Sequence, residues 1–319
     1  MPRLRWRHSF PSHPVANLRA LLLINRQSRE GEANAKQACD ALSALDVDVT
    51  LGRFERPDDV AAEIDAHARD VDVVVLGGGD GTLNLAASAM MRCGRPLAVL
   101  PLGTANDFAR TLLIPAALEA ACRNVVEGID HGVDVGQCND VYFVNVASMG
   151  LAVRACEYRS DVAKRWFGSL GYASNVFSAY RDTEPFDVTV DCAGERYQLR
   201  SIQLAVGNGR YFGGGLPVAS DAALDDERLD LYSLEPQGFW SMVGKLPALA
   251  RGPDRSVRGV QLFDGRSFRV TTNRPMPINT DGEILTETPA SFRVLPQALT
   301  VKVPRAYIDQ YASEKGRIE

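Results

Sequence analysis

Four short apolar runs separated by segments with helical spacing occupy the first hundred residues, and this alternation limits the possible fold more than any other feature. The apolar runs are LRALLLIN (18–25), VDVTL (47–51), VDVVVL (71–76) and LAVLP (97–101). Segments 32–45, 58–69 and 83–92 lie between them and space alanine and leucine as helices do. Strands that are apolar along their whole length are typical of a parallel sheet with helices on both faces. We therefore expect a Rossmann-like α/β domain whose ligand lies at the carboxyl ends of its strands.

After about residue 130 the pattern changes to short strand-like runs separated by Gly, Asp, Asn and Pro. Examples are YFVNVASMGL (142–151), FDVTVDC (186–192) and ALTVKVP (298–304). This spacing is typical of antiparallel β structure. One segment with helical character, 162–180, interrupts it. The sequence thus predicts two domains of different class, with a boundary near 130–145.

Composition excludes some functions and disfavours others. The 319 residues carry a net charge of −5 and are 45% hydrophobic, which is ordinary for a globular protein and too acidic for a typical nucleic-acid binder. Apolar runs stay well short of the ~18 residues that a membrane span needs. Residues 1–16 hold Arg3, Arg5 and Arg7, no acid and no continuous apolar segment. We expect a disordered basic tail there, or an arm that touches anionic lipid, rather than a secretory signal.

The hexapeptide GGGDGT (77–82) stands where the third strand gives way to a helix. Glycines in such a turn let backbone N–H groups approach a phosphate, and a helix N-terminus adds positive potential. Thr82 replaces the last glycine of a G-x-G-x-x-G fingerprint, and the lysine of a Walker A loop is missing. The segment therefore predicts a phosphate loop that takes its cation from elsewhere. The alternative is a tight turn that binds nothing.

Three further segments carry polar residues suited to chemistry. PLGTANDFAR (101–110) follows the next strand, so its Thr104, Asn106 and Asp107 should face the same sheet edge as GGGDGT. Asp134 lies between two valines, where a carboxylate is costly to bury without a partner. TDGE (280–283) offers two carboxylates that would share one face if the segment is extended, and phosphoryl transfer needs a base and a metal-supporting carboxylate. Simple helix capping, turn capping and a hairpin turn remain the alternatives.

Together these motifs resemble the diacylglycerol kinase catalytic-domain family, especially the soluble bacterial lipid kinases that are related to sphingosine and ceramide kinases. The resemblance runs from about residue 18 to 304. GGDGT followed by GTANDFAR at this spacing is highly specific, whereas GGDGT alone also resembles NAD kinases and phosphofructokinases. Further matching segments are VDVG (133–136), YFVNVASMG (142–150), GNGRYFGGG (207–215), LDDERLDL (224–231) and TDGE (280–283).

The resemblance implies a nucleotide-binding α/β domain over 17–140, to which residues 300–319 return, and an antiparallel β-sandwich domain over 141–300. It places the active site in the cleft between the domains. It also implies ATP as phosphoryl donor, Mg²⁺, and a lipid hydroxyl as acceptor at a membrane surface. The enzyme would be cytoplasmic and peripheral at the membrane, with no nucleic-acid partner, and a homodimer stays open.

The resemblance also implies roles for individual residues. Asp281 would be the general base, with Glu283 as a second candidate. Asp226 would hold a second, structural metal ion together with the backbone carbonyls of Ala223 and Arg228. The carboxylates expected to gather Mg²⁺ through water are Asp80, Asp107, Asp134 and Glu283. The residues expected at the nucleotide are Asn25, Thr50, Gly78, Gly79, Asp80, Gly81, Thr82, Thr104 and Asn106.

Two departures from the family pattern qualify these expectations. The first-strand loop is NRQSR (25–29) where the family has Asn-Pro-x-Ser-Gly, and Glu227 stands where the family has glycine in the metal turn. If position 227 needs a positive φ, a side chain there costs about 1 kcal/mol. Two rivals follow: an NAD kinase-like small-molecule kinase, and a nucleotide-binding regulatory protein without turnover. The acceptor stays open among diacylglycerol, phosphatidylglycerol, a sphingoid base and an isoprenoid alcohol.

Overall fold

The computed structural model describes residues 17–25, 31–52, 54, 56, 59–157, 180–212, 216–217, 223–241, 244 and 257–315. The structural statements below refer to these residues. Three predicted segments lie outside them: the basic tail 1–16, the altered loop 26–29, and nearly all of the expected helix 162–180.

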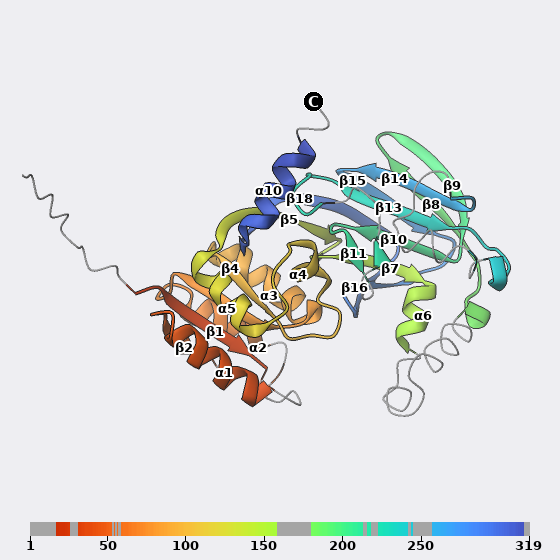
Figure 1. Ribbon diagram of the computed structural model, residues 1–319. Helices are drawn as coiled ribbons and strands as arrows, with labels where there is room; N and C mark the ends of the chain where they lie inside the picture. The colour runs from red at the N-terminus through yellow and green to blue at the C-terminus, as the bar shows by residue number, and fades with distance from the viewer. Residues whose placement is uncertain are drawn as a thin grey trace, which may run out of the picture.

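The N-terminal half contains four parallel strands in the order β2-β1-β3-β4. Helices precede or follow each strand, as the alternating sequence predicts (Figure 1). The strands are β1 (Arg19–Ile24), β2 (Asp48–Leu51), β3 (Val73–Gly78) and β4 (Leu97–Pro101). The helices are α1 (Gly31–Ser43), α2 (Asp59–His67), α3 (Asp80–Cys93), α4 (Asp107–Thr111) and α5 (Leu118–Glu127).

Alternate residues of each central strand pack into opposite helix layers. In β1, Ala20 and Leu22 pack with residues of α1 and α5, whereas Leu21 and Leu23 pack with residues of α2 and α3. All four are completely buried, and burying a leucine side chain contributes about 1.5–3 kcal/mol. The prediction of a parallel sheet covered on both faces is confirmed.

The second half is a sandwich of two sheets. One is the continuation of the N-terminal sheet through β18-β15-β8-β9, and the other is a six-stranded antiparallel sheet in the order β14-β13-β10-β7-β16-β17. Phe186, Phe268 and Phe292 of the first sheet share one buried core with Leu231 and Ile278 of the second. The elements are β5 (Ile129–Cys138), β6 (Val141–Phe143), β7 (Val146–Gly150), α6 (Leu151–Glu157), β8 (Phe186–Cys192), β9 (Glu195–Ser201), β10 (Gln203–Gly207), β11 (Tyr211–Phe212), β12 (Leu216–Pro217), β13 (Leu229–Leu234), β14 (Val260–Gly265), β15 (Ser267–Thr272), β16 (Pro277–Thr280), β17 (Glu283–Glu287), β18 (Ala290–Val303) and α10 (Arg305–Lys315).

Strand β18 connects the two halves. Its 14 residues pair with β15 of the sandwich at one end and with β4 of the N-terminal sheet at the other, where Val301 lies opposite Leu97. Between these points it pairs antiparallel with β5. Helix α10 follows, and its Tyr307 packs into the core of the N-terminal half. The N-terminal sheet and one layer of the sandwich are therefore one continuous ten-stranded sheet.

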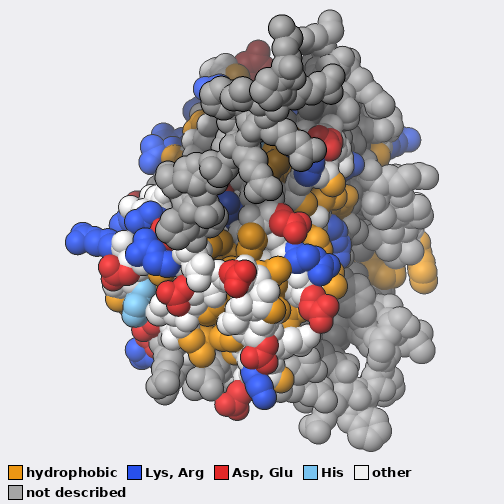
Figure 2. Space-filling model, turned by 60° about the vertical axis from the view of Figure 1, so that its left-hand side comes forward, with side chains coloured by type: hydrophobic (Ala, Val, Ile, Leu, Met, Phe, Trp, Pro, Cys, Tyr) orange, Lys and Arg blue, Asp and Glu red, His pale blue; other side chains and the backbone are white. Residues whose placement is uncertain are grey.

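Acidic and basic side chains are interspersed with apolar ones on the face seen in Figure 2, in keeping with the balanced composition. Within the described ranges, every helix is too short or too polar to cross a bilayer.

Helix α3 begins earlier than its apolar spacing predicts. We expect a helix from residue 83, but it begins at Asp80, and Gly77 and Gly78 belong to β3. The first turn is polar, so a search for apolar spacing does not detect it, although an acidic residue there is favourable to the helix dipole. Only Gly79 separates the strand from the helix.

Candidate active site

The two glycine-containing loops of the N-terminal half touch each other. A Cβ atom added to Gly103 would lie 2.4 Å from the Cα of Gly79, and one added to Gly78 would lie 2.7 Å from Oγ1 of Thr82. Real side chains do not tolerate such distances. Glycine is therefore required at Gly103 by the close approach of two backbones.

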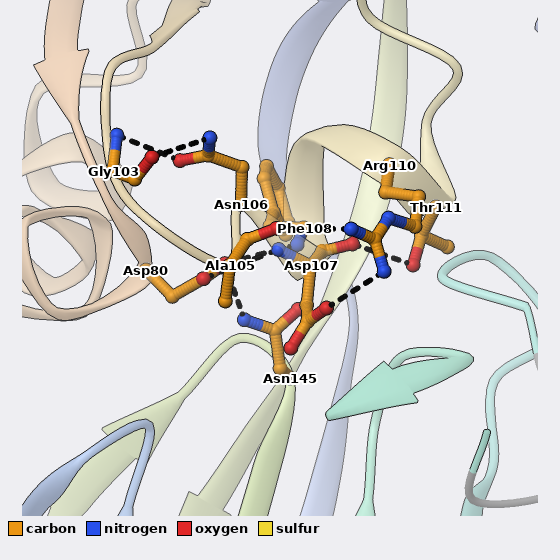
Figure 3. Close-up of polar contacts among 9 residues, drawn as sticks. All are labelled: Asp80, Gly103, Ala105, Asn106, Asp107, Phe108, Arg110, Thr111 and Asn145. Atoms are coloured by element: carbon orange, nitrogen blue, oxygen red, sulfur yellow. Dashed lines mark hydrogen bonds and ion pairs between the residues drawn. The ribbon is translucent and has the colours of Figure 1, made fainter. Parts of the chain in front are cut away.

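Asp80, the first residue of α3, links three elements. Its carboxylate accepts hydrogen bonds from the backbone N–H groups of Asp107 (3.1 Å) and Phe108 (3.0 Å) at the start of α4. It also accepts one from Nδ2 of Asn145 (2.9 Å), which belongs to the sandwich half (Figure 3). Asp80 thus supplies the N-terminal cap that α4 lacks from its own residues.

Asn106 uses its amide group to close its own loop. Oδ1 accepts from the N–H of Gly103 at 2.9 Å, and Nδ2 donates to the carbonyl oxygens of Gly103 (2.9 Å) and Pro101 (3.2 Å). The backbone of Asn106 is left-handed, with φ of 51°, which asparagine tolerates better than most residues. Thr104, two residues earlier, is exposed.

Asp107 is 3% exposed, and its carboxylate lies near positive charge. Oδ1 is 3.6 Å from Nη1 of Arg110 in the next turn. The guanidinium of Arg110 lies 5.9 Å from the ring centre of Tyr211, and that of Arg210 lies 5.7 Å from the same ring. Two arginines, Arg110 of α4 and Arg210, therefore lie close to the ring of Tyr211.

Asp281 occupies a hairpin turn between β16 and β17. Thr280 pairs with Glu283, so the connection has two residues, and both have positive φ: 49° at Asp281 and 109° at Gly282. This is the type I′ turn typical of such hairpins. From their spacing we expect Asp281 and Glu283 on one face of an extended segment. The turn separates them instead. Asp281 turns inward, whereas Glu283 is exposed at the start of β17.

The carboxylate of Asp281 is held by three consecutive backbone N–H groups. The donors belong to Val144 (2.6 Å), Asn145 (3.0 Å) and Val146 (2.9 Å). Removal from water raises the pKa of Asp281 to about 7; the three hydrogen bonds oppose this shift, and the negative charge of Asp80 adds to it. Asp80 and Asp281 are thus close enough to influence each other's charge.

The start of α3 also contacts this turn directly. Nδ2 of Asn84 donates to the carbonyl oxygen of Thr280 at 3.4 Å, and a Cβ on Gly81 would meet the carbonyl oxygen of Asp281 at 3.9 Å. We call this meeting place the junction site: residues 79–84, 103–108, 144–146 and 280–283. It brings together the carboxylates of Asp80, Asp107 and Asp281 from three separate segments.

Asp134 lies outside the junction site, whereas Glu283 lies in it with an exposed side chain. Asp134 is 1% exposed, and its two carboxylate oxygens accept from the N–H groups of Gln297 (2.8 Å) and Glu227 (2.7 Å). Burial raises its pKa, and these hydrogen bonds oppose the rise. Its connection to the junction site passes through Asn208, whose Nδ2 donates to the carbonyl oxygens of Asp134 and Val144. In the part of the chain that the structure describes, no three His, Cys, Asp or Glu side chains are grouped to hold a metal ion.

Comparison with known proteins places this geometry in a family. Residues 19–138 match the diacylglycerol kinase catalytic domain, and residues 145–303 match the YegS C-terminal NAD kinase beta sandwich-like domain. A probable lipid kinase YegS-like from Enterobacter sp. (strain 638) is 30% identical over 293 residues, which cover 89% of this chain and 96% of that protein. The chain belongs to the diacylglycerol kinase family of lipid kinases.

Other relatives agree. A probable lipid kinase YegS-like from Klebsiella pneumoniae (strain 342) is 29% identical over 291 residues, which cover 89% of this chain and 96% of that protein. The crystal structure of a diacylglycerol kinase from Bacillus anthracis str. Sterne has a TM-score of 0.70 and 22% identity, and the match covers 91% of this chain and 98% of that one. This structural likeness shows that the two-part fold is shared.

The residues that the family likeness places at the nucleotide lie at one edge of the sheet. Asn25 follows β1, and Thr50 is near the end of β2 and exposed. Gly78 ends β3 and residues 79–82 follow it, and Thr104 and Asn106 follow β4. These four strands are parallel, so their carboxyl ends meet at the same edge. The placement suits a nucleotide that lies across the tips of the strands.

The turn expected to hold a second metal ion has a different chemical character. The carboxylate of Asp226 accepts from the N–H groups of Ala223 and Arg228, both at 3.2 Å, and lies 3.2 Å from Nε of Arg228. Nε of Arg228 is also 3.6 Å from Asp230. Burial raises the pKa of Asp226 to about 7, and Arg228 opposes the rise. Among the described residues, the Asp226 carboxylate is contacted by two N–H donors and a guanidinium, which is the environment of an ion pair.

Glu227 keeps the turn in the conformation that glycine would favour. Its φ is 57°, in the left-handed region, which costs about 1 kcal/mol for a residue with a side chain. The backbone N–H of Glu227 donates to Asp134, and the Glu227 side chain forms an ion pair with Arg266. These contacts help to stabilise a conformation that the sequence alone makes unfavourable.

Sequence reasoning missed the side-chain amides that join the two halves: Asn84, Asn145 and Asn208. A signal was present for Asn145, because it interrupts the apolar run YFVNVASMG. A polar side chain in such a run must find partners when it is buried. The pattern does not say which partners, since these come from segments far apart in the chain.

Proposed function

We propose that this protein transfers the γ-phosphoryl group of ATP to a hydroxyl group of a lipid, with Mg²⁺ as the required ion. The observation that carries the proposal is the contact of the glycine loop with the carboxylate-bearing turn, through Asp80, Asn145 and Asp281. Phosphoryl transfer needs a phosphate-binding loop and a proton acceptor that face each other, and catalysis then depends mainly on position and charge.

The nucleotide phosphates would lie against residues 78–82. Helix α3 has 14 residues, and its N-terminus gives partial positive charge and free N–H groups to an anion. Thr50, Asn25 and the exposed Thr104 would contact the rest of the nucleotide. Arg110 and Arg210 lie beside α4 and would offset phosphate charge in place of a loop lysine.

Asp107 and Asp80 would hold Mg²⁺ mainly through its water molecules. Mg²⁺ keeps several waters in most protein sites and needs few direct carboxylates, so a group of three acidic ligands is not required. The backbone N–H of Asp107 donates to the Asp80 carboxylate, so the two residues are neighbours in space, and Asp107 is buried. When bound, the ion would neutralise charge on the phosphoryl group during transfer.

Within the TDGE turn we propose Glu283 as the proton acceptor and Asp281 as the anchor of the turn. Both oxygens of Asp281 already accept backbone N–H groups, which fix its position. Glu283 is exposed and lies two residues away, where an incoming hydroxyl can reach it. As the bond between the hydroxyl oxygen and the γ-phosphorus forms, the bond to the β-phosphate oxygen breaks, the hydroxyl proton passes to Glu283, and ADP leaves.

The acceptor side is apolar and open. Ile284 and Leu285 follow Glu283 in the edge strand β17 and are 48% and 45% exposed. Trp240, in a short helical turn of the sandwich half, is 80% exposed. Ile284 and Leu285, directly after the proposed base, suit a substrate whose hydroxyl is attached to an acyl chain, and the exposed apolar side chains suit contact with a membrane surface.

A lipid-panel kinase assay tests the proposal. The purified protein is incubated with ATP, Mg²⁺ and vesicles that contain diacylglycerol, phosphatidylglycerol, a sphingoid base or an isoprenoid alcohol, and the products are identified by mass spectrometry. We expect one lipid class to gain a phosphate only when Mg²⁺ is present. Phosphate transfer to NAD and to none of the lipids would instead establish a small-molecule kinase. Nucleotide binding without transfer to any acceptor would establish a regulatory protein.

A further inference from the structure

Asn145 contacts both halves of the junction site with different atoms. Its backbone N–H donates to Asp281 (3.0 Å), and its side-chain Nδ2 donates to Asp80 (2.9 Å). Its carbonyl oxygen accepts from the N–H groups of Asn208 (2.8 Å) and Gly209 (3.1 Å). The residue is only 2% exposed, so its position is fixed by these contacts.

The remaining polar atom of Asn145, Oδ1, is buried and has no hydrogen-bond partner within the described ranges. Asp107 and Asn145 both donate to the carboxylate of Asp80, so they lie beside each other. Figure 3 shows Oδ1 directed toward the side on which the Asp107 carboxylate lies. Turning the amide over gives no relief, because Oδ1 would then face Asp80.

We propose that Asn145 is a positioning residue that holds Asp80 and Asp281 in one arrangement and directs its amide oxygen, with Asp107, at the cation of the site. The proposal rests on the proposed function and adds a residue to which no role is otherwise assigned. An amide oxygen with partial negative charge and a carboxylate that face the same space repel each other unless a cation or its water lies between them. An unsatisfied buried oxygen is rare in proteins and is a frequent mark of an ion or water site.

Asparagine alone meets both demands at this position. It presents a donor to Asp80 and an acceptor to the cation from one planar group. Aspartate has the same shape but loses the donor, glutamine is one methylene too long for a buried site, and alanine loses both groups. Asn145→Ala and Asn145→Asp therefore separate the two functions of the side chain.

The matched control is Asn124, which is also buried and 7% exposed. Its Nδ2 donates to the carbonyl oxygen of Lys302 at 2.8 Å, between α5 and β18 and outside the junction site. Asn124→Ala and Asn124→Asp remove the same groups from an equally buried place. They report what loss of a buried amide does to folding alone.

The experiment measures Mn²⁺ binding to the full chain by electron paramagnetic resonance, without lipid, together with the melting temperature, kcat and KM. Asn145→Ala should weaken Mn²⁺ binding about 10-fold, since it loses one oxygen near the ion and the donor that holds Asp80. Asn145→Asp should bind Mn²⁺ more tightly than wild type, because it adds a negative charge. Both variants should lower kcat by about 10- to 100-fold with little change in KM for ATP. The Asn124 variants should keep wild-type Mn²⁺ binding.

The opposite signs for the two Asn145 variants distinguish this role from a merely structural one. If both variants lose Mn²⁺ affinity in parallel with their melting temperatures, or if neither changes Mn²⁺ binding, the proposal is wrong. If the signs are as expected but wild type phosphorylates no lipid, the proposed lipid kinase reaction fails and the role of Asn145 stands. If wild type phosphorylates lipid and Asn145→Ala is unchanged in kcat and Mn²⁺ binding, the lipid kinase reaction stands and the role of Asn145 fails.

Discussion

The turns that carry Asp281 and Asp226 are alike in most local respects and differ in the charges around them. In each, a residue with a side chain has a positive φ, the aspartate accepts backbone N–H groups, and burial raises its pKa to about 7. Asp226 lies against Arg228 and near Asp230, whereas Asp281 lies near the negative charge of Asp80. The Asp226 turn carries its own cation. The Asp281 turn gathers acidic groups and is the one that would need a cation from outside.

This contrast shows that a shifted pKa does not by itself identify a functional carboxylate. Desolvation is the largest cause at both sites, so the shift reports burial. What distinguishes a site for metal-assisted chemistry is uncompensated negative charge beside a phosphate-binding loop. Five predictions test the comparison, from the largest expected effect to the smallest.

Asp281→Ala should have the largest effect. The variant leaves three backbone N–H groups without their acceptor, and each such loss costs about 1–3 kcal/mol when the group stays buried. We expect a fall in the free energy of unfolding of about 3 kcal/mol or more and lipid kinase activity below about 0.1% of wild type. Denaturant unfolding and the lipid assay measure the two quantities.

Asp226→Ala is the counterpart in the other turn. It removes the acceptor of two N–H groups and the partner of Arg228, so it should destabilise the fold as well. Activity per folded molecule should fall by less than about 10-fold, because the turn is outside the junction site. Equal loss of activity in both variants would contradict the contrast between the turns.

Glu283→Gln should separate chemistry from stability. The side chain is exposed, so the melting temperature should change by no more than about 1–2 °C. A lost proton acceptor should lower kcat by about 100-fold or more. Glu227→Gln is the matched control, since it follows Asp226 as Glu283 follows the Asp281 turn, and it should keep kcat. A Glu283→Gln variant with wild-type kcat would return the base to Asp281.

Gly103→Ala should act on the loop that faces the Asp281 turn. The added Cβ would lie 2.4 Å from the Cα of Gly79, so the two loops must separate. We expect a loss of about 1–3 kcal/mol in the free energy of unfolding and a rise in KM for ATP. Gly238→Ala is the control, since its Cβ would meet nothing within 4 Å. Unchanged KM for ATP in Gly103→Ala would show that the contact of the loops does not shape the nucleotide site.

Asp226→Asn should give the smallest effect, a change in the pH dependence of stability. The pKa of Asp226 is about 7 in the folded protein and near 3.9 in the unfolded chain. Its contribution to stability is therefore present below pH 4 and is lost as pH rises through 7. Asparagine does not titrate, so the melting temperature of the variant relative to wild type should rise between pH 5 and pH 8.

Asp191→Asn is the control for this pH experiment. Its partner Arg196 lowers the pKa of Asp191, so that group is already ionised throughout pH 5 to 8. The difference in melting temperature between Asp191→Asn and wild type should stay constant over this range. A constant difference for Asp226→Asn as well would show that Asp226 is ionised in the folded protein at pH 5.

The sequence predicted the N-terminal half well because that half is built from local patterns. Apolar runs such as VDVVVL specify strands, the alternation specifies helices on both faces, and the glycine loop lies at the strand-to-helix transition. The positive φ of Glu227 was also predictable, because a glycine is expected there. Helix α3 was predicted to begin three residues too late, because its first turn carries polar residues.

The junction site was only partly predictable, because its contacts join segments far apart in the chain. Asp80 and Asp107 are close in sequence and follow neighbouring strands, so their meeting could be foreseen. Asp281 points inward because TDGE forms a hairpin turn. The same four residues are also compatible with an extended segment, so the sequence does not decide between the two. Asp134 lies in a segment that matches the family, as the other acidic residues do. Its hydrogen bonds to Glu227 and Gln297 join residues far apart in the chain, so the sequence spacing does not predict them. The contact of Arg228 with Asp226 is likewise not predicted by the sequence, because it depends on the conformation of the turn.

Strand β18 has a consequence for how the molecule opens and how it unfolds. Because its 14 residues belong both to the N-terminal sheet and to the sandwich, a rigid swing of one half away from the other would have to bend β18, whose pairing with β5 is interrupted between Leu295 and Leu299. The same strand makes the halves cooperative: neither can lose its sheet without removing a partner strand from the other, so the chain should melt in a single transition.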